Sequence, residues 1–165
     1  MSGFDSHEFK ELVNNFKQLA KDYDKFTTDF LMQEGMRCLA NTKRRTPVDM
    51  GTLRNRWKLS GPFKRGNTKY VVIHNNLNYA SFVEDGHMQR ERFLPIKYLE
   101  QSPDGAKLAA TLRGRYGSDI QGIMLKNRWI KGHHMARIAL TQTENKFDSR
   151  FEKAFTAFCK AKGIG

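Results

Sequence analysis

The sequence predicts an α+β domain: a long N-terminal helix and a C-terminal helix packed on a small antiparallel β-sheet, with a long loop excursion. Helically spaced apolar residues in the first 44 positions and in residues 135–161 predict the two helices. Between them, strand-forming runs bounded by turn residues predict antiparallel strands. The chain has 165 residues, of which 39% are apolar, so we expect one domain, residues 1–165, with a packed core.

Residues 1–44 are predicted to form the long helix. Its apolar residues recur at alternating steps of three and four, a period that also permits packing against another helix. They are Phe9, Leu12, Phe16, Leu19, Tyr23, Phe26 and Phe30. Most of them are too bulky for a regular two-stranded seam, so we expect them to pack within their own domain. Asp5, Glu8 and Glu11 suit the dipole at the helix start, and the helix must end before Pro47.

Residues 45–86 are predicted to form strands. Residues 53–59 and 68–74 contain strand formers, and Gly and Pro residues between them supply turn chemistry. This pattern predicts a hairpin with a loop of five to eight residues. A further short strand or extended segment is expected at residues 79–83.

Residues 87–127 form the least periodic part of the chain. We expect a long loop excursion there, with one or two turns of helix at residues 108–113. Long loops commonly carry function, so contacts with partners are expected in this segment. Residues 128–165 are predicted to hold a short strand around Trp129, followed by the C-terminal helix.

The charges are unevenly distributed. Residues 1–42 carry five basic and seven acidic side chains, whereas the remaining 123 residues carry 24 basic and ten acidic ones. A basic surplus of this size favours an anionic partner, either DNA or an acidic protein surface. No long apolar run or signal-like start is present, so we expect no membrane contact and synthesis in a cytoplasm. In that compartment Cys38 and Cys159 are expected to be buried reduced thiols.

Residues 43–75 hold nine basic side chains and one acidic one. If residues 53–59 form a strand, then Arg54, Arg56 and Lys58 share one face of it. The resulting basic stripe has three open interpretations: a face lining a DNA channel, a docking face for an acidic neighbour, or a solvated surface. Its candidate residues are Arg44, Arg45, Arg54, Arg56, Lys58, Lys64 and Arg65.

No catalytic, metal or cofactor site is predicted. The sequence lacks nucleophile-elbow, phosphate-loop and zinc-protease motifs. The cluster worth testing consists of His133 and His134 with His87, Glu84 and Asp85, but it lacks a reproducible metal-ligand spacing. We therefore expect a non-enzymatic protein.

Three stretches follow one another along the chain. Residues 47–55 read Pro-Val-Asp-Met-Gly-Thr-Leu-Arg-Asn, residues 79–86 read Tyr-Ala-Ser-Phe-Val-Glu-Asp-Gly, and residues 132–136 read Gly-His-His-Met-Ala. Together with the long helix before them, they resemble the pattern of the Hong Kong 97-type gene-product-ten-like tail and neck components of bacteriophages. Met50 departs from the threonine usual in that family, and Asn55-Arg56 stands where a serine is common.

The motif residues are expected to be structural. They are Pro47, Asp49, Gly51, Leu53, Arg54, Tyr79, Glu84, Gly86, Gly132, His133 and Met135. Asp49 can accept backbone hydrogen bonds in a turn, and Gly51 can supply a positive φ. Arg54 is expected to pair with Glu84 or Asp85. The histidine pair is expected to mark the start of the last helix, with a ring nitrogen bonded to the backbone.

The resemblance implies a structural virion protein that completes the tail or joins head to tail in the neck. It implies a ring of six or twelve copies whose partners are neck, stopper, tail-terminator or tail-tube proteins, with genomic DNA passing through, and assembly in the host bacterial cytoplasm. The charge distribution suggests that the acidic helix of one subunit meets the basic sheet of the next. The alternative function is sequence-independent DNA binding through the basic stripe.

Overall fold

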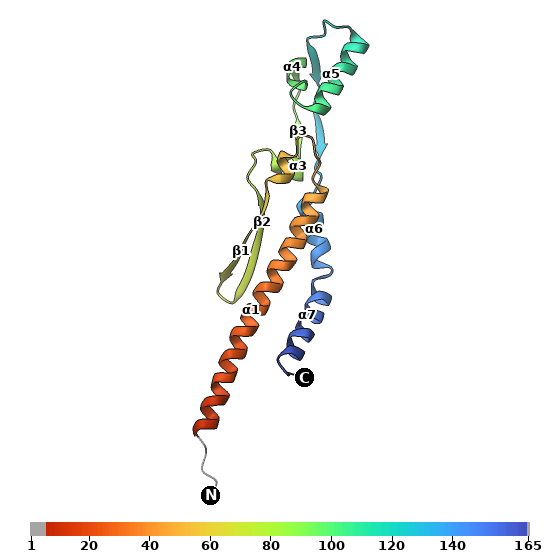
Figure 1. Cartoon of the computed structure of the whole chain (residues 1–165). Helices are drawn as coiled ribbons and strands as arrows, with labels where there is room; N and C mark the ends of the chain where they lie inside the picture. Colours follow the sequence, from red (N-terminus) through yellow and green to blue (C-terminus); the bar gives the residue numbers. More distant parts are fainter. Residues whose placement is uncertain (1–5, 165) are drawn as a thin grey trace.

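The computed structural model describes residues 6–164 and confirms the α+β class. Figure 1 shows an elongated molecule in which a long helix runs beside a hairpin and two C-terminal helices, and a narrow arm extends beyond them. The elements are α1 (Ser6–Arg45), α2 (Thr52–Asn55), β1 (Trp57–Arg65), β2 (Thr68–Asn75), α3 (Ala80–Asp85), β3 (Gly86–Gln89), β4 (Arg92–Pro95), α4 (Ile96–Leu99), α5 (Pro103–Tyr116), β5 (Gly122–Leu125), β6 (Arg128–Lys131), α6 (Met135–Glu144) and α7 (Phe147–Ala161). The predicted small sheet is divided into three antiparallel ladders, β1–β2, β3–β6 and β4–β5.

Helix α1 is the scaffold against which the hairpin, α6 and α7 pack. It confirms the predicted long helix, and Asp5 lies outside the described residues. Small side chains allow α6 to approach α1 closely: Cys38, Thr42 and Ala139 are buried, and Thr143 contacts the Cys38 thiol. Burial raises the pKa of this thiol. The expected burial therefore holds for Cys38, whereas the Cys159 thiol, also free, is only half-buried.

The hairpin is present as predicted, but its loop is shorter. β1 continues across a bulge between Ser60 and Phe63, so that Gly66 and Asn67 alone separate the two strands. The expected loop of five to eight residues is therefore wrong. A bulge adds residues to one strand without ending the pairing, which is why Gly and Pro inside the strand were compatible with a continuing ladder.

Close approach and one ion pair hold the hairpin on α1. A Cβ at Gly35 would lie 3.0 Å from side-chain atoms of both Leu59 and Val71. Further along the hairpin, the Lys69 Nζ atom lies 2.8 Å from the Asp24 carboxylate and donates a hydrogen bond to the Asp24 carbonyl oxygen. This ammonium group holds the pKa of the Asp24 carboxyl below its ordinary value.

Two segments predicted as strands are short helices instead. Residues 53–55 belong to α2, and most of residues 79–83 belong to α3. In each case the core-facing residues are spaced by three or four positions: Leu53 precedes Trp57, and Ala80 precedes Val83. That spacing places both members of a pair on one side of a helical turn. In a strand, Ala80 and Val83 would have pointed to opposite faces, whereas Leu53 and Trp57 would have shared a face in either structure.

The predicted loop excursion is an ordered arm, residues 86–131. Two ladders, β3–β6 and β4–β5, form its stem, and α4 and α5 lie at its far end (Figure 1). The stem pairs residues distant in sequence, such as Met88 with Trp129, so no local period announces it. Helix α5 is longer than the one or two turns expected because Ser102 caps its start, accepting a hydrogen bond from the Gly105 amide at 3.2 Å.

The predicted C-terminal helix is divided in two. α6 ends at Glu144, and α7 begins at Phe147 after the turn residues Asn145 and Lys146. The absence of Gly and Pro from this segment made one continuous helix the expected result, which is wrong. The break lets α6 pack beside α1 near its C-terminal end while α7 follows α1 back toward its middle (Figure 1).

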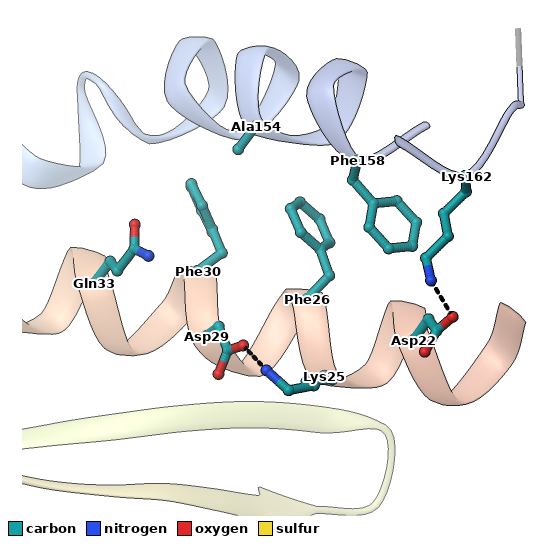
Figure 2. Close-up of a pocket in the computed structure, with 9 residues that line it drawn as sticks. All are labelled: Asp22, Lys25, Phe26, Asp29, Phe30, Gln33, Ala154, Phe158 and Lys162. Carbon is teal, nitrogen blue, oxygen red and sulfur yellow. Dashed lines mark hydrogen bonds and ion pairs between the residues drawn. The ribbon is translucent and has the colours of Figure 1, made fainter. Parts of the chain in front are cut away.

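Aromatic side chains form the seam between α1 and α7. Figure 2 shows Phe26 and Phe30 of α1 pointing toward α7, where the Phe158 ring lies 4.8 Å from that of Phe26. The rings of Phe147 and Phe151 each lie 5.3 Å from that of Phe30. Phe26 and Phe30 therefore pack within their own chain, as expected. For Leu12 and Phe16 of the same predicted set that expectation is wrong, because α7 ends before it reaches them and their side chains are exposed; Phe9 is exposed as well.

Replacing Phe30 with alanine tests this seam. We expect Phe30→Ala to lower the free energy of unfolding by about 3–5 kcal/mol, because a buried ring is lost and a cavity remains. Phe16→Ala is the matched control on the same helix, since the Phe16 side chain is 62% exposed. Urea denaturation of both variants at a concentration that keeps the protein monomeric measures the difference; equal losses would contradict the described seam.

Candidate functional site

The three sequence motifs meet in one buried cluster. Leu53 comes from the first motif, Ala80 from the second and Met135 from the third, and Trp57 completes the cluster. Met135 has 0% of its surface exposed. The motif residues thus join distant segments, with Leu53 and Met135 lying 82 positions apart, into the core from which the arm departs.

Glu84 caps the start of α6. Its two carboxylate oxygens accept hydrogen bonds from the backbone amides of Ala136, at 3.1 Å, and Arg137, at 3.0 Å. The residue at the N-cap position, His134, makes no such bond with its own side chain and has a left-handed backbone, φ 49°. A carboxylate at this position satisfies two otherwise unbonded amides and suits the positive end of the helix dipole. The second motif therefore fixes the start of the helix that the third motif opens.

Two glycines allow the backbones of these motifs to touch. A Cβ at Gly132 would lie 2.3 Å from the Glu84 carbonyl oxygen, and a Cβ at Gly86 would lie 2.5 Å from the Ile130 carbonyl oxygen. Gly86 also has φ +86°, which L side chains rarely adopt. Backbone amides reinforce the contact: that of His133 donates to the Val83 carbonyl oxygen at 2.8 Å. We call the contact between residues 83–86 and 132–137 the arm junction.

The first motif forms the turn between α1 and α2. Gly51 has φ +80°, the positive value that the turn needs. Arg54 donates to the Thr46 carbonyl oxygen at 3.3 Å, so the expected pairing with Glu84 or Asp85 is wrong. Glu84 is engaged by α6, and Asp85 pairs with Arg137.

Other residues of the first two motifs border a hollow. Pro47, Asp49, Gly51 and Tyr79 are among the residues around its volume of about 380 Å³. Within residues 6–164, the Asp49 carboxylate accepts no hydrogen bond, so the expected Asp49 turn is not formed by its side chain.

The histidines contribute through their backbones. The amide of His134 donates to the Glu84 carbonyl oxygen at 2.9 Å, whereas the ring Nδ1 atoms of His134 and His87 are buried without a partner in the described chain. The expected bond from a ring nitrogen of the histidine pair to the backbone is formed by neither His133 nor His134 within residues 6–164, so that expectation is wrong. Among the residues that the structure describes, no group of three His, Cys, Asp or Glu side chains is placed to hold a metal ion.

The predicted basic stripe does not form one face. Arg54 lies in α2 and Arg56 directly follows it, so neither alternates with Lys58 along a strand. Lys58 pairs with His74, but beyond the bulge Lys64 pairs with Lys69, whose side chain points to α1. Lys58 and Lys64 therefore lie on opposite faces of the hairpin.

The seven residues of the predicted basic stripe are spread along the molecule. Arg44 and Arg45 end α1, near α2, whereas Lys64 and Arg65 lie beside the hairpin turn at the other end of the hairpin (Figure 1). All of them are exposed except Arg45, which is half-buried. The basic residues thus form separate patches.

The sequence interpretation missed a buried ion pair between α1 and α7. Glu34 is 3% exposed, and its carboxylate lies 2.6 Å from an Arg150 guanidinium nitrogen and 3.2 Å from one of Arg37. A buried carboxylate needs such partners. Its position beside the apolar stripe of α1 is the signal that could have marked it.

Removing the Glu84 carboxylate tests the arm junction. We expect Glu84→Ala to lower the free energy of unfolding by about 0.5–2 kcal/mol, the usual effect of losing a helix cap. Glu91→Ala is the control, because that carboxylate lies on the exposed surface of the arm and its loss should change stability by less than about 0.5 kcal/mol. Chemical denaturation measures both; an equally small effect at Glu84 would contradict its role as a cap.

None of the helices within residues 6–164 combines the length and apolar character needed to cross a membrane.

Residues 10–86 match the family model described as "Bacteriophage HK97-gp10, putative tail-component". The matched segment holds most of α1, the hairpin and α3 and ends at the arm junction, so the third motif lies beyond it. No curated protein and no solved structure matches the chain. The match indicates a bacteriophage tail component. The resemblance to the Hong Kong 97-type gene-product-ten-like family, predicted from the motifs, is therefore confirmed for residues 10–86.

Proposed function

We propose that the protein completes the tail or joins head to tail in the neck of a tailed bacteriophage, as a ring of six or twelve copies. The observation that carries this proposal, beside the family match, is the elongated shape with apolar side chains exposed at both ends. At one end Leu12 and Phe16 are exposed on α1, and at the other Phe93 and Met124 are exposed on the arm. Such surfaces are typical of subunits that are completed by assembly. The protein acts in this proposal by geometry, not by catalysis.

The arm is the proposed contact with other virion proteins. Its stem exposes two apolar cross-strand pairs, Met88 with Trp129 and Phe93 with Met124. Exposed aromatic and methionine side chains are enriched in protein interfaces. We propose that the neighbouring neck, stopper, tail-terminator or tail-tube protein binds here, in the host cytoplasm where the virion assembles.

Fewer acidic residues of α1 are available for the proposed charge pairing between subunits than the sequence suggests. Asp22 and Asp24 already pair within the chain, with Lys162 and Lys69. The hydrogen bond from Lys162 holds the pKa of the Asp22 carboxyl below its ordinary value. The acidic side chains in the first turns of α1 are Glu8 and Glu11, and they stand beside Lys10 and Lys17. The exposed Arg and Lys side chains remain available to a protein neighbour or to passing DNA.

Particles produced without this gene test the proposal. We expect electron microscopy to show heads separate from tails, or tails of abnormal length, because the junction lacks a subunit. Supplying the gene from a plasmid should restore joined virions, which controls for effects on neighbouring genes. Normal joined virions in the absence of the protein would contradict the proposed role.

The exposed basic patches favour sequence-independent DNA binding as a second candidate function. In that case, binding to random duplex DNA should weaken steeply with salt, by roughly tenfold or more between 50 and 200 mM if several phosphates are contacted. Lys58→Glu combined with Arg56→Glu should abolish it. Fluorescence anisotropy checks this; affinity that does not change with salt would remove the DNA-binding function.

A further inference from the structure

The apolar face of α1 continues past the end of its cover. From Phe30 to Tyr23 this face contacts α7, and Lys162, directly after α7, reaches Asp22 with its Nζ atom 2.5 Å from the carboxylate (Figure 2). One turn further, Leu19, Phe16 and Leu12 lie on the same face at the same spacing. These three apolar residues, and not the basic residues described above, are called the stripe. Figure 1 shows this part of α1 extending beyond α7 and the hairpin.

Two of the three stripe residues are exposed, although the stripe continues a packed seam; Leu19 is half-buried. Leu12 is 51% and Phe16 62% exposed, whereas Phe30, on the same face, is buried. Exposing bulky apolar side chains to water is unfavourable compared with burying them. The stripe thus has the apolar composition that is typical of a surface buried in a protein–protein interface.

The same chain contains an apolar groove of about 530 Å³ between β2 and α6. α1 forms its floor at Leu31 and Gly35, Val72 of β2 forms one wall, and Leu140 of α6 forms the other. Leu140 is 51% exposed. The bulge and Pro62 interrupt the far edge of the hairpin, so β1 is poorly suited to pair with a neighbour. The groove beside β2 is the better recess.

We infer that the stripe of one copy occupies the groove of the next copy in the ring. This inference rests on the proposed ring function and names its interface. The stripe cannot fold back into its own groove, because α1 is one continuous helix that also forms the groove floor. Only a second chain can supply it. A stripe and a groove on different parts of each subunit make a head-to-tail contact, the kind that closes into a ring.

The contact rests on apolar surface and not on charge. Glu8 and Glu11 lie beside the stripe, but so do Lys10 and Lys17. The groove lining likewise carries Arg137 and Lys69 together with Glu34 and Glu144, and Arg137 already pairs with Asp85. The stripe continues the apolar seam between α1 and α7, so burial in an apolar groove is what it lacks.

Mixing two complementary variants tests the inference. The stripe variant is Phe16→Asp, the groove variant is Leu140→Asp, and the control is Met36→Asp, an exposed α1 residue outside both surfaces. Analytical ultracentrifugation should show that each of the first two associates at least about 30-fold more weakly than wild type. The control should assemble normally. All three replaced side chains are exposed, so circular dichroism should show unchanged folding.

An equal mixture of the stripe and groove variants should give 1:1 heterodimers and no rings. Each such pair has one intact contact, between the groove of the stripe variant and the stripe of the groove variant. If the groove variant assembles like wild type, the stripes pair with each other instead and the inference is overturned. A wild-type protein that stays monomeric throughout also overturns it. The particle phenotype of the gene deletion decides the neck function independently of either result.

Discussion

The close backbone contact at the arm junction fixes where the arm leaves the body and where it returns. Gly86 begins the first strand of the arm, and Gly132 follows the last. The chain therefore enters and leaves the arm at two positions where a Cβ would collide with carbonyl oxygens. The Glu84 carboxylate then starts α6 within the same few residues. Because α6 packs on α1, one contact sets the direction of the arm relative to the long helix.

The second organising feature is α1, which is longer than the part its own chain covers. Its C-terminal half is packed by the hairpin, α6 and α7, and a buried carboxylate at Glu34 fixes the approach of α7. Its first turns carry the same apolar period without a cover. A helix with one part buried in its own chain and another part exposed fits a protein whose function lies in assembly. The same apolar spacing along α1 then accounts for both the packing of the fold and the proposed contact in the ring.

Periodic segments could be predicted from the sequence, and long-range pairing could not. The three- and four-residue steps from Phe9 to Phe30 predict α1, and the run before Asn75 predicts β2. The helical turns at Leu53 and Ala80 were hidden because four or six residues are too few to show a period. The arm stem pairs Met88 with Trp129, and no local signal marks such partners.

The motifs predicted the location of the site better than its bonds. Glu84, Gly86, Gly132 and Met135 do come together, but Glu84 binds backbone amides of α6 rather than Arg54. Whether a carboxylate binds a guanidinium group or a helix start depends on the fold, and the strand expected at residues 79–83 placed Glu84 wrongly.

Electron spin resonance distances between labels at Met36→Cys and Tyr116→Cys, with Cys38→Ala and Cys159→Ser, test the arm junction most directly. A fixed junction predicts one narrow distance distribution; a broad distribution would contradict it.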